Sequence, residues 1–121
     1  MQIPTMSIYL SMVLMIMTSK MRKKKFKHLF VDTIPVNLQG GILYVSLRYN
    51  MVSHLCACGC GHRIDTPIAP EEWQMVYDGE SITLRPSIGN WDLPCQSHYF
   101  ITQNIAIPAS RKRRRWLFFS F

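Results

Sequence analysis

The 121-residue chain has no apolar run long enough to cross a bilayer. Its mostly apolar stretch at residues 7–17 falls well short of the roughly 20 residues that a transmembrane helix needs. Positive charges follow this stretch, whereas a signal peptide carries them in front, and no small-residue cleavage site is evident. These absences argue against secretion. We expect residues 1–20 to be an extraneous leader, with a short interfacial anchor backed by lysines as the alternative.

Acidic residues are also scarce: seven, against 14 lysines and arginines, leave a formal net charge of +7. The basic residues gather in runs at 20–27 and 111–115, whereas every acid lies between Asp32 and Asp92. The central part is therefore net negative, and the basic character belongs to the ends. Such runs are usually solvated tails that attract phosphate without reading bases. Any contact with nucleic acid is thus expected through the tails alone.

Cysteine is rare, but its four positions are informative. Cys56, Cys58 and Cys60 alternate along the chain, too close to pair comfortably with one another, and Cys95 is the only distant partner. Two disulfides therefore explain the pattern poorly. Thiolates that converge on a cation explain it better, and reduced cysteines of this kind are typical of a cytoplasmic protein.

A zinc site is the strongest functional prediction from the sequence. Structural zinc usually takes about four thiolate or imidazole ligands from two segments, which residues 56–60 and 94–98 offer here. Two arrangements stay open: a closed structural site of three cysteines and a histidine, or an open site in which zinc activates a bound water. The candidate ligands exceed what a tetrahedral site needs: Cys56, Cys58, Cys60, Cys95 and His98.

Three polar residues near these segments are catalytic candidates, namely His54, Ser87 and Asn90. Ser87 and Asn90 shortly precede the second metal segment, so we expect them to approach the zinc, with ordinary turn chemistry as the alternative. A spare cysteine activated by His54 is another chemical option. A nucleobase deaminase is disfavoured, because no glutamate stands at the required offset beside the cysteine cluster.

The remaining pattern predicts a mainly β fold, with a small α+β fold as the variant: a compact, zinc-stapled domain of short strands and loops. Strand formers fill residues 42–47 and 98–102. Asp78–Gly79 predicts a hairpin turn between residues 73–77 and 81–84.

Other segments lack such a strand pattern. Residues 86–91 have the composition of a loop, and Pro70 with the acids after it predicts one helical turn. We place the zinc-binding domain at residues 21–103 and a basic, aromatic C-terminal tail at residues 104–121.

Several motifs make the chain resemble a family of small bacterial proteins catalogued as a domain of unknown function. The motifs fall within residues 26–103: His54–Gly61, Thr66–Pro67, Asp78–Gly79, Pro86–Trp91 and Pro94–Tyr99. Some members of that family are linked to bacterial ubiquitin-like modification systems. The resemblance implies a zinc-dependent hydrolase or peptidase that cuts after a ubiquitin-like C terminus in a modification or defence system. The alternative is a non-catalytic structural zinc module that binds a protein or nucleic-acid partner.

Overall fold

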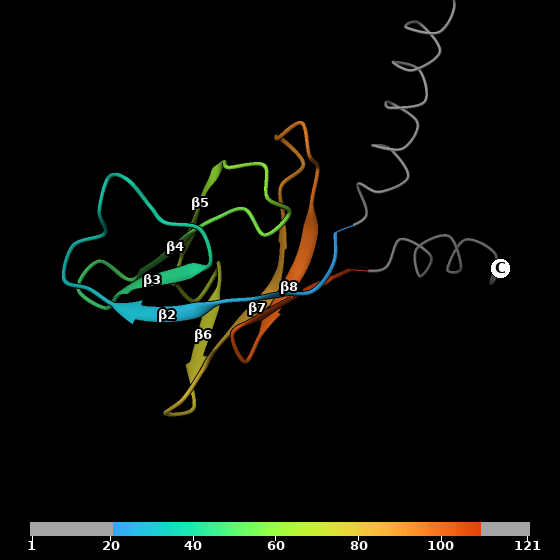
Figure 1. Ribbon diagram of the computed structural model, residues 1–121. Helices are drawn as coiled ribbons and strands as arrows, with labels where there is room; N and C mark the ends of the chain where they lie inside the picture. The colour runs from blue at the N-terminus through green and yellow to red at the C-terminus, as the bar shows by residue number, and fades with distance from the viewer. Residues whose placement is uncertain (1–20, 110–121) are drawn as a thin grey trace, which may run out of the picture.

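The computed structural model describes residues 21–109, and every regular element in that range is a strand. They form a five-stranded sheet in the order β1-β9-β8-β7-β6 and a four-stranded sheet in the order β2-β3-β4-β5, seen at the right and left of Figure 1. The prediction of a mainly β fold is confirmed. The strands are β1 (Lys24–Lys25), β2 (Lys27–Phe30), β3 (Ile42–Ser46), β4 (Met51–Leu55), β5 (Arg63–Pro67), β6 (Gln74–Tyr77), β7 (Ile82–Gly89), β8 (His98–Thr102) and β9 (Ile105–Pro108).

The predicted leader at residues 1–20 and most of the predicted tail, from residue 110 onward, lie outside the described residues. The first part of that tail, Ile105–Pro108, forms β9 and pairs antiparallel with β8. Within residues 21–109, no helix has the length and hydrophobicity needed to cross a membrane.

The predicted hairpin is confirmed: β6 and β7 pair antiparallel across the turn at Asp78. The Asp78 carboxylate accepts backbone hydrogen bonds from Glu80 and Ser81, and these bonds lower its pKa. Gly79 has a φ of +96°, a backbone conformation that residues with a side chain rarely adopt.

The prediction of a loop at residues 86–91 is wrong for its first part, because β7 continues to Gly89. Pro86 and Gly89 suggested a loop, since proline cannot donate to a strand ladder and glycine weakens a strand. The β7–β8 register shifts between Leu84 and Ile88, so Pro86 lies where the ladder is interrupted. At such an irregularity a missing N–H is tolerated.

The segment that begins at Pro70 forms a single turn and not a helix, with the Glu72 amide donating to the Ala69 carbonyl at 3.0 Å. The chain then returns towards the end of β5. Trp73 N–H donates to the Pro67 carbonyl, and the Trp73 carbonyl accepts from the Ala69 amide.

The hydrophobic core lies between the two sheets and draws on both. Phe26, between β1 and β2, is buried where the chain passes from one sheet to the other, and its amide donates to the Asn104 carbonyl at 2.7 Å. Strand alternation supplies much of the remainder, as in β7, where Ile82 and Leu84 are buried and the intervening residue is half-buried.

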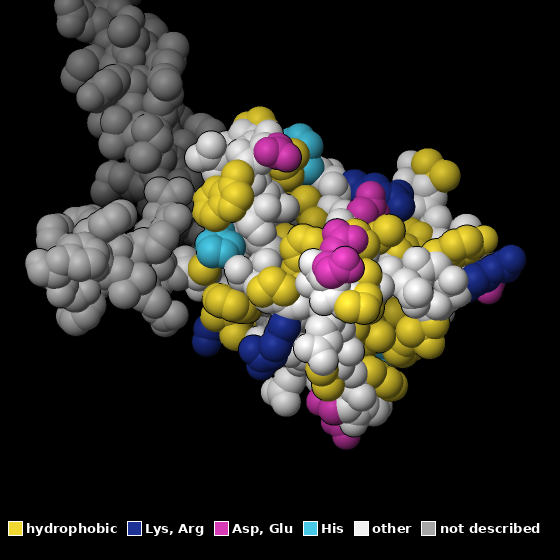
Figure 2. Space-filling model, turned by 180° about the vertical axis from the view of Figure 1, so that it is seen from behind, with side chains coloured by type: hydrophobic (Ala, Val, Ile, Leu, Met, Phe, Trp, Pro, Cys, Tyr) yellow, Lys and Arg dark blue, Asp and Glu magenta, His cyan; other side chains and the backbone are white. Residues whose placement is uncertain are grey.

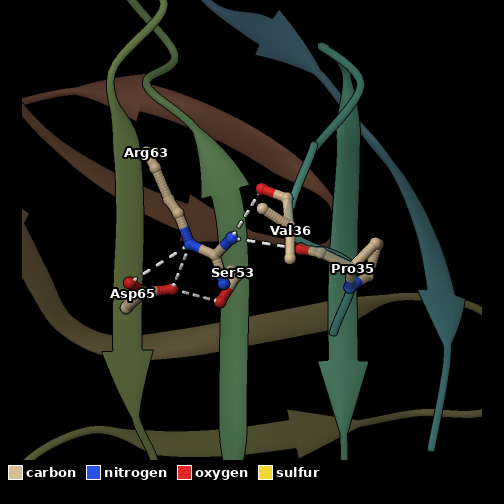
Figure 3. A network of polar contacts seen from close by, with 5 residues as sticks. All are labelled: Pro35, Val36, Ser53, Arg63 and Asp65. Carbon is tan, nitrogen blue, oxygen red and sulfur yellow. Dashed lines mark hydrogen bonds and ion pairs between the residues drawn. The ribbon is translucent and has the colours of Figure 1, made fainter. Parts of the chain in front are cut away.

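A polar network on the four-stranded sheet holds the long connection between β2 and β3 (Figure 3). Arg63 donates to the carbonyls of Pro35 and Val36, each at 3.1 Å, and also bonds the Asp65 carboxylate. Ser53 donates to the same carboxylate. A connection of this length is needed because β2 and β3 are parallel, and the network ties it to β4 and β5.

Candidate functional site

The four cysteines meet at one end of the domain, although they come from two loops. Cys56, Cys58 and Cys60 lie between β4 and β5, and Cys95 lies between β7 and β8. All four are free thiols, and their Sγ atoms lie within 4.8 Å of one another. The sequence prediction that these residues converge is thus matched by the geometry.

The spacing of the sulfurs fits a tetrahedral metal ion. The Sγ separations are 3.5 Å for Cys56–Cys58, 3.7 Å for Cys60–Cys95 and 3.9 Å for Cys56–Cys95. A tetrahedron with zinc–sulfur bonds of about 2.3 Å has sulfur–sulfur edges of roughly 3.8 Å. A disulfide would instead need a separation of about 2.05 Å. The four cysteines therefore fit a metal ion better than a disulfide.

Two tight turns bring the thiols together. Gly59 and Gly61 have φ values of +93° and +86°, and the Gly59 amide donates to the Cys56 carbonyl at 3.0 Å. In the second loop, the Gln96 amide donates to the Leu93 carbonyl at 3.0 Å, and this turn encloses Cys95. Glycine is needed in the first loop because both positions adopt the left-handed backbone region.

The surroundings of the thiols shift their pKa values in different directions. Burial raises the pKa of Cys58 and of Cys60. Burial also opposes ionisation of Cys95, but hydrogen bonds with Ser97, Cys58 and Cys60 together outweigh it and lower the pKa of Cys95 to about 7. A bound cation would favour the thiolate form at all of these positions, since a coordinating thiol is deprotonated outright.

Ser97 and Asn90 surround the buried thiol. Ser97 Oγ lies 3.0 Å from Cys56 Sγ, and Asn90 Nδ2 donates to Ser97 Oγ at 2.8 Å. Because the amide occupies an acceptor site of the hydroxyl, the hydroxyl proton is free to point at the sulfur. Asn90, a catalytic candidate from the sequence, thus lies beside the cysteines. Sequence reasoning missed Ser97, whose signal was its place between Cys95 and His98.

A serine–histidine pair lies across β7 and β8. Ser87 Oγ is 2.8 Å from His98 Nε2, and both residues are half-buried. His98 begins β8 and stands opposite Gly89, two residues beyond the serine. The predicted ligand His98 is not part of the four-sulfur group. The reason is that His98 already lies on β8, whereas Cys95 lies in the loop before that strand.

Aromatic rings border this pair. The Trp91 ring lies 5.0 Å from the His98 ring, centroid to centroid, and Trp91 is 45% exposed. Phe100 follows His98 on the same face of β8, with ring centroids 6.4 Å apart. On the other side, the Trp73 indole N–H donates to the Ser87 carbonyl at 3.3 Å. Aromatic side chains therefore border the Ser87–His98 pair, which lies close to solvent.

His54, the third catalytic candidate, lies in the core. It is fully buried, and its Nε2 lies 2.7 Å from Tyr99 Oη. Burial lowers the pKa of His54 to about 4, so the ring is neutral near pH 7. The Phe26 ring packs against it edge-on. These contacts are those of a packed core residue.

Replacing Tyr99 by phenylalanine should destabilise the domain, because it removes the hydroxyl that partners His54. An unpaired buried polar group costs about 1–3 kcal/mol, which should lower the free energy of unfolding by that amount. Denaturant titration of Tyr99→Phe beside Tyr49→Phe would measure it, since Tyr49 is 56% exposed and its replacement should change little. Equal stability of the two variants would show that the buried hydrogen bond contributes nothing.

Residues 21–109 thus form an all-β domain that carries a four-cysteine cluster and a serine–histidine pair. The family model described as bacterial ubiquitination-like system serine protease (BubE) matches residues 30–108. This range covers most of the chain, and the chain belongs to that family. The expected link to bacterial ubiquitin-like systems is thereby confirmed. Neither the comparison with curated proteins nor that with solved structures returned a match.

Proposed function

We propose that the chain is a serine protease that cuts a peptide bond at the C terminus of a ubiquitin-like protein or of its conjugates. The observation that carries this proposal is the 2.8 Å contact between Ser87 Oγ and His98 Nε2. A nucleophile within hydrogen-bond reach of a base is the signature of nucleophilic catalysis. Membership in the BubE family supports the reaction class and the ubiquitin-like substrate.

The proposed reaction has two halves. Ser87 Oγ attacks the scissile carbonyl carbon while its proton passes to His98 Nε2, and the protonated imidazole then gives that proton to the leaving amine. The acyl ester on Ser87 is released when water attacks it, with His98 accepting the proton of the water and returning one to Ser87. The enzyme is thus restored without any other reactant.

We propose zinc as the metal and Cys56, Cys58, Cys60 and Cys95 as its ligands. All-thiolate sets of this kind are typical of structural zinc, which fixes the positions of chain segments. Four sulfurs complete a tetrahedron, so this site is closed and we assign the bond cleavage to Ser87. The metal would join the loop after β4 to the loop before His98.

A protein substrate also suits the surface. On the face shown in Figure 2, the lysine and arginine side chains form small separate groups among hydrophobic and acidic ones. A nucleic-acid site usually needs basic residues gathered in one patch or stripe. The distribution on this face favours a protein partner over nucleic acid.

The test is a cleavage assay with the ubiquitin-like protein of the same bacterial system, carrying a short C-terminal peptide extension. Intact mass spectrometry should detect loss of the extension at one peptide bond. Metal-loaded, folded protein that leaves every such fusion uncut would overturn the proposed activity and favour a non-catalytic zinc module.

Replacing Ser97 by alanine should weaken zinc binding, because the hydroxyl lies 3.0 Å from Cys56 Sγ. Loss of a partner that orients a metal ligand typically lowers affinity by about 10–100-fold. Competition with a chromophoric chelator measures this directly. Ser81→Ala is the matched control, because Ser81 bonds Asp78 in the distant β6–β7 turn. Equal affinities for the two variants would remove Ser97 from the metal centre.

A further inference from the structure

The strand that carries Ser87 loses its neighbour partway along. The β6–β7 pairing ends at Gln74 opposite Arg85, and before Gln74 the chain turns away. The Trp73 backbone bonds Pro67 and Ala69 instead of β7. Within residues 21–109, no strand therefore pairs with the last part of β7 on the side where β6 would have continued.

Along this part of β7, the backbone N–H and C=O groups of successive residues point alternately towards β8 and away from it. The backbone N–H of Asn90 donates to the Ser97 carbonyl, so the backbone polar groups of residue 90 point towards β8. The Ser87 carbonyl accepts from the Trp73 indole and so points to the opposite side. In an extended chain, successive residues alternate in this way. The N–H and C=O of Gly89 therefore point to the side that β6 vacates, as does the Ser87 N–H.

The vacated edge is open to solvent. Pro86 and Gly89, which lie past the last β6–β7 pair, are exposed. The Trp91 indole occupies the place of that side chain, since a Cβ on Gly89 would lie 2.6 Å from Trp91 Nε1. A chain beside Gly89 would meet a flat aromatic surface next to His98.

We propose that the substrate binds as an added β-strand along Ser87–Gly89, beyond the end of β6, while the Ser87 carbonyl keeps its bond from the Trp73 indole. This inference rests on the proposed function and names its substrate class: a flexible, extended segment, such as a C-terminal tail, and not a folded loop. Strand addition recognises the peptide backbone through ladder hydrogen bonds. Neighbouring strands lie about 4.8 Å apart, so a scissile carbonyl carried on such a strand would run beside Ser87.

An ester scan of the substrate tests this binding mode. Semisynthetic versions of the extended ubiquitin-like protein would carry an ester in place of one amide at successive positions before the cut. Added-strand binding predicts an alternating effect: an ester at one position should lower kcat/KM by about tenfold, and an ester at the next position should change it less than twofold. Uniform effects, or none, would overturn the proposal.

A binding measurement keeps this inference separate from the proposed activity. The isotope-labelled Ser87→Ala variant would be titrated with a synthetic peptide of the same tail while amide exchange is followed by NMR. The Gly89 amide should exchange at least about tenfold more slowly at saturation, whereas the Ile88 amide, which faces β8, should not change. A peptide that fails to bind, or binds without protecting Gly89, would overturn strand addition. A peptide that binds in this way while fusions stay uncut would overturn only the protease assignment.

Discussion

Replacing Ser87 by alanine is expected to abolish cleavage of an extended ubiquitin-like protein while the domain stays folded and keeps its metal. The change removes the attacking oxygen, and such losses lower kcat by a factor on the order of 10⁴ or more. The cost in stability should be small, because Ser87 is half-buried and its Oγ contacts a histidine that is itself half-buried. Single-turnover cleavage, melting curves and metal content of the same preparation measure all three properties.

The controls separate the nucleophile from its surroundings. Ser81→Ala makes the same chemical change in a distant turn and should keep full activity. His98→Asn should lose activity to a similar extent, and the double variant with Ser87→Ala should lose no more than either single one, because the two residues act as a unit. Full activity in Ser87→Ala would contradict this assignment.

Removing the metal is expected to unfold much of the domain. Zinc binds structural sites with apparent free energies of about 10–16 kcal/mol, of the same order as the whole stability of a small domain, about 5–15 kcal/mol. Cys56 is 2% exposed and belongs to the core cluster, so disruption at the metal reaches the packing between the sheets. Chelation under reducing conditions should lower Tm by tens of degrees or abolish the cooperative transition.

Substitution at a single ligand should reproduce this effect. Cys60→Ser should lower Tm strongly, although Cys60 is exposed and buries little apolar surface. Ser81→Ala is the control, since Ser81 bonds Asp78 in the β6–β7 turn and contacts none of the four sulfurs. Zinc, but not magnesium, should restore a chelated sample, because thiolates select the softer ion. An unchanged melting curve after verified metal loss would rule out a structural role.

The cysteine cluster was predictable because its signal is local. Cys56, Cys58 and Cys60 lie close together, with Gly59 between the last two and Gly61 directly after them. Few arrangements other than a metal centre accommodate that density. The strands at residues 42–47 and 98–102 and the Asp78 hairpin had similarly local signals, and the structure has strands at Ile42–Ser46 and His98–Thr102.

The serine–histidine pair could not be predicted in the same way, because it depends on strand register. The Cys95 to His98 spacing suggests two ligands on one turn, but β8 begins at His98 and turns its side chain to Ser87. Nothing local indicates that Gly89 and His98 stand opposite each other, since that register arises from pairing around an irregularity near Pro86. Ser87 was a candidate from the sequence, and its partner emerges only in three dimensions.

The most direct test is to treat the metal-loaded protein with a fluorophosphonate and map the modified residue by mass spectrometry. Oγ of an activated serine attacks phosphorus and expels fluoride, whereas an ordinary serine reacts negligibly. We predict one adduct per chain, located on Ser87 and absent from His98→Asn. A folded protein that takes up no label at Ser87, or takes it up equally without His98, would contradict the account.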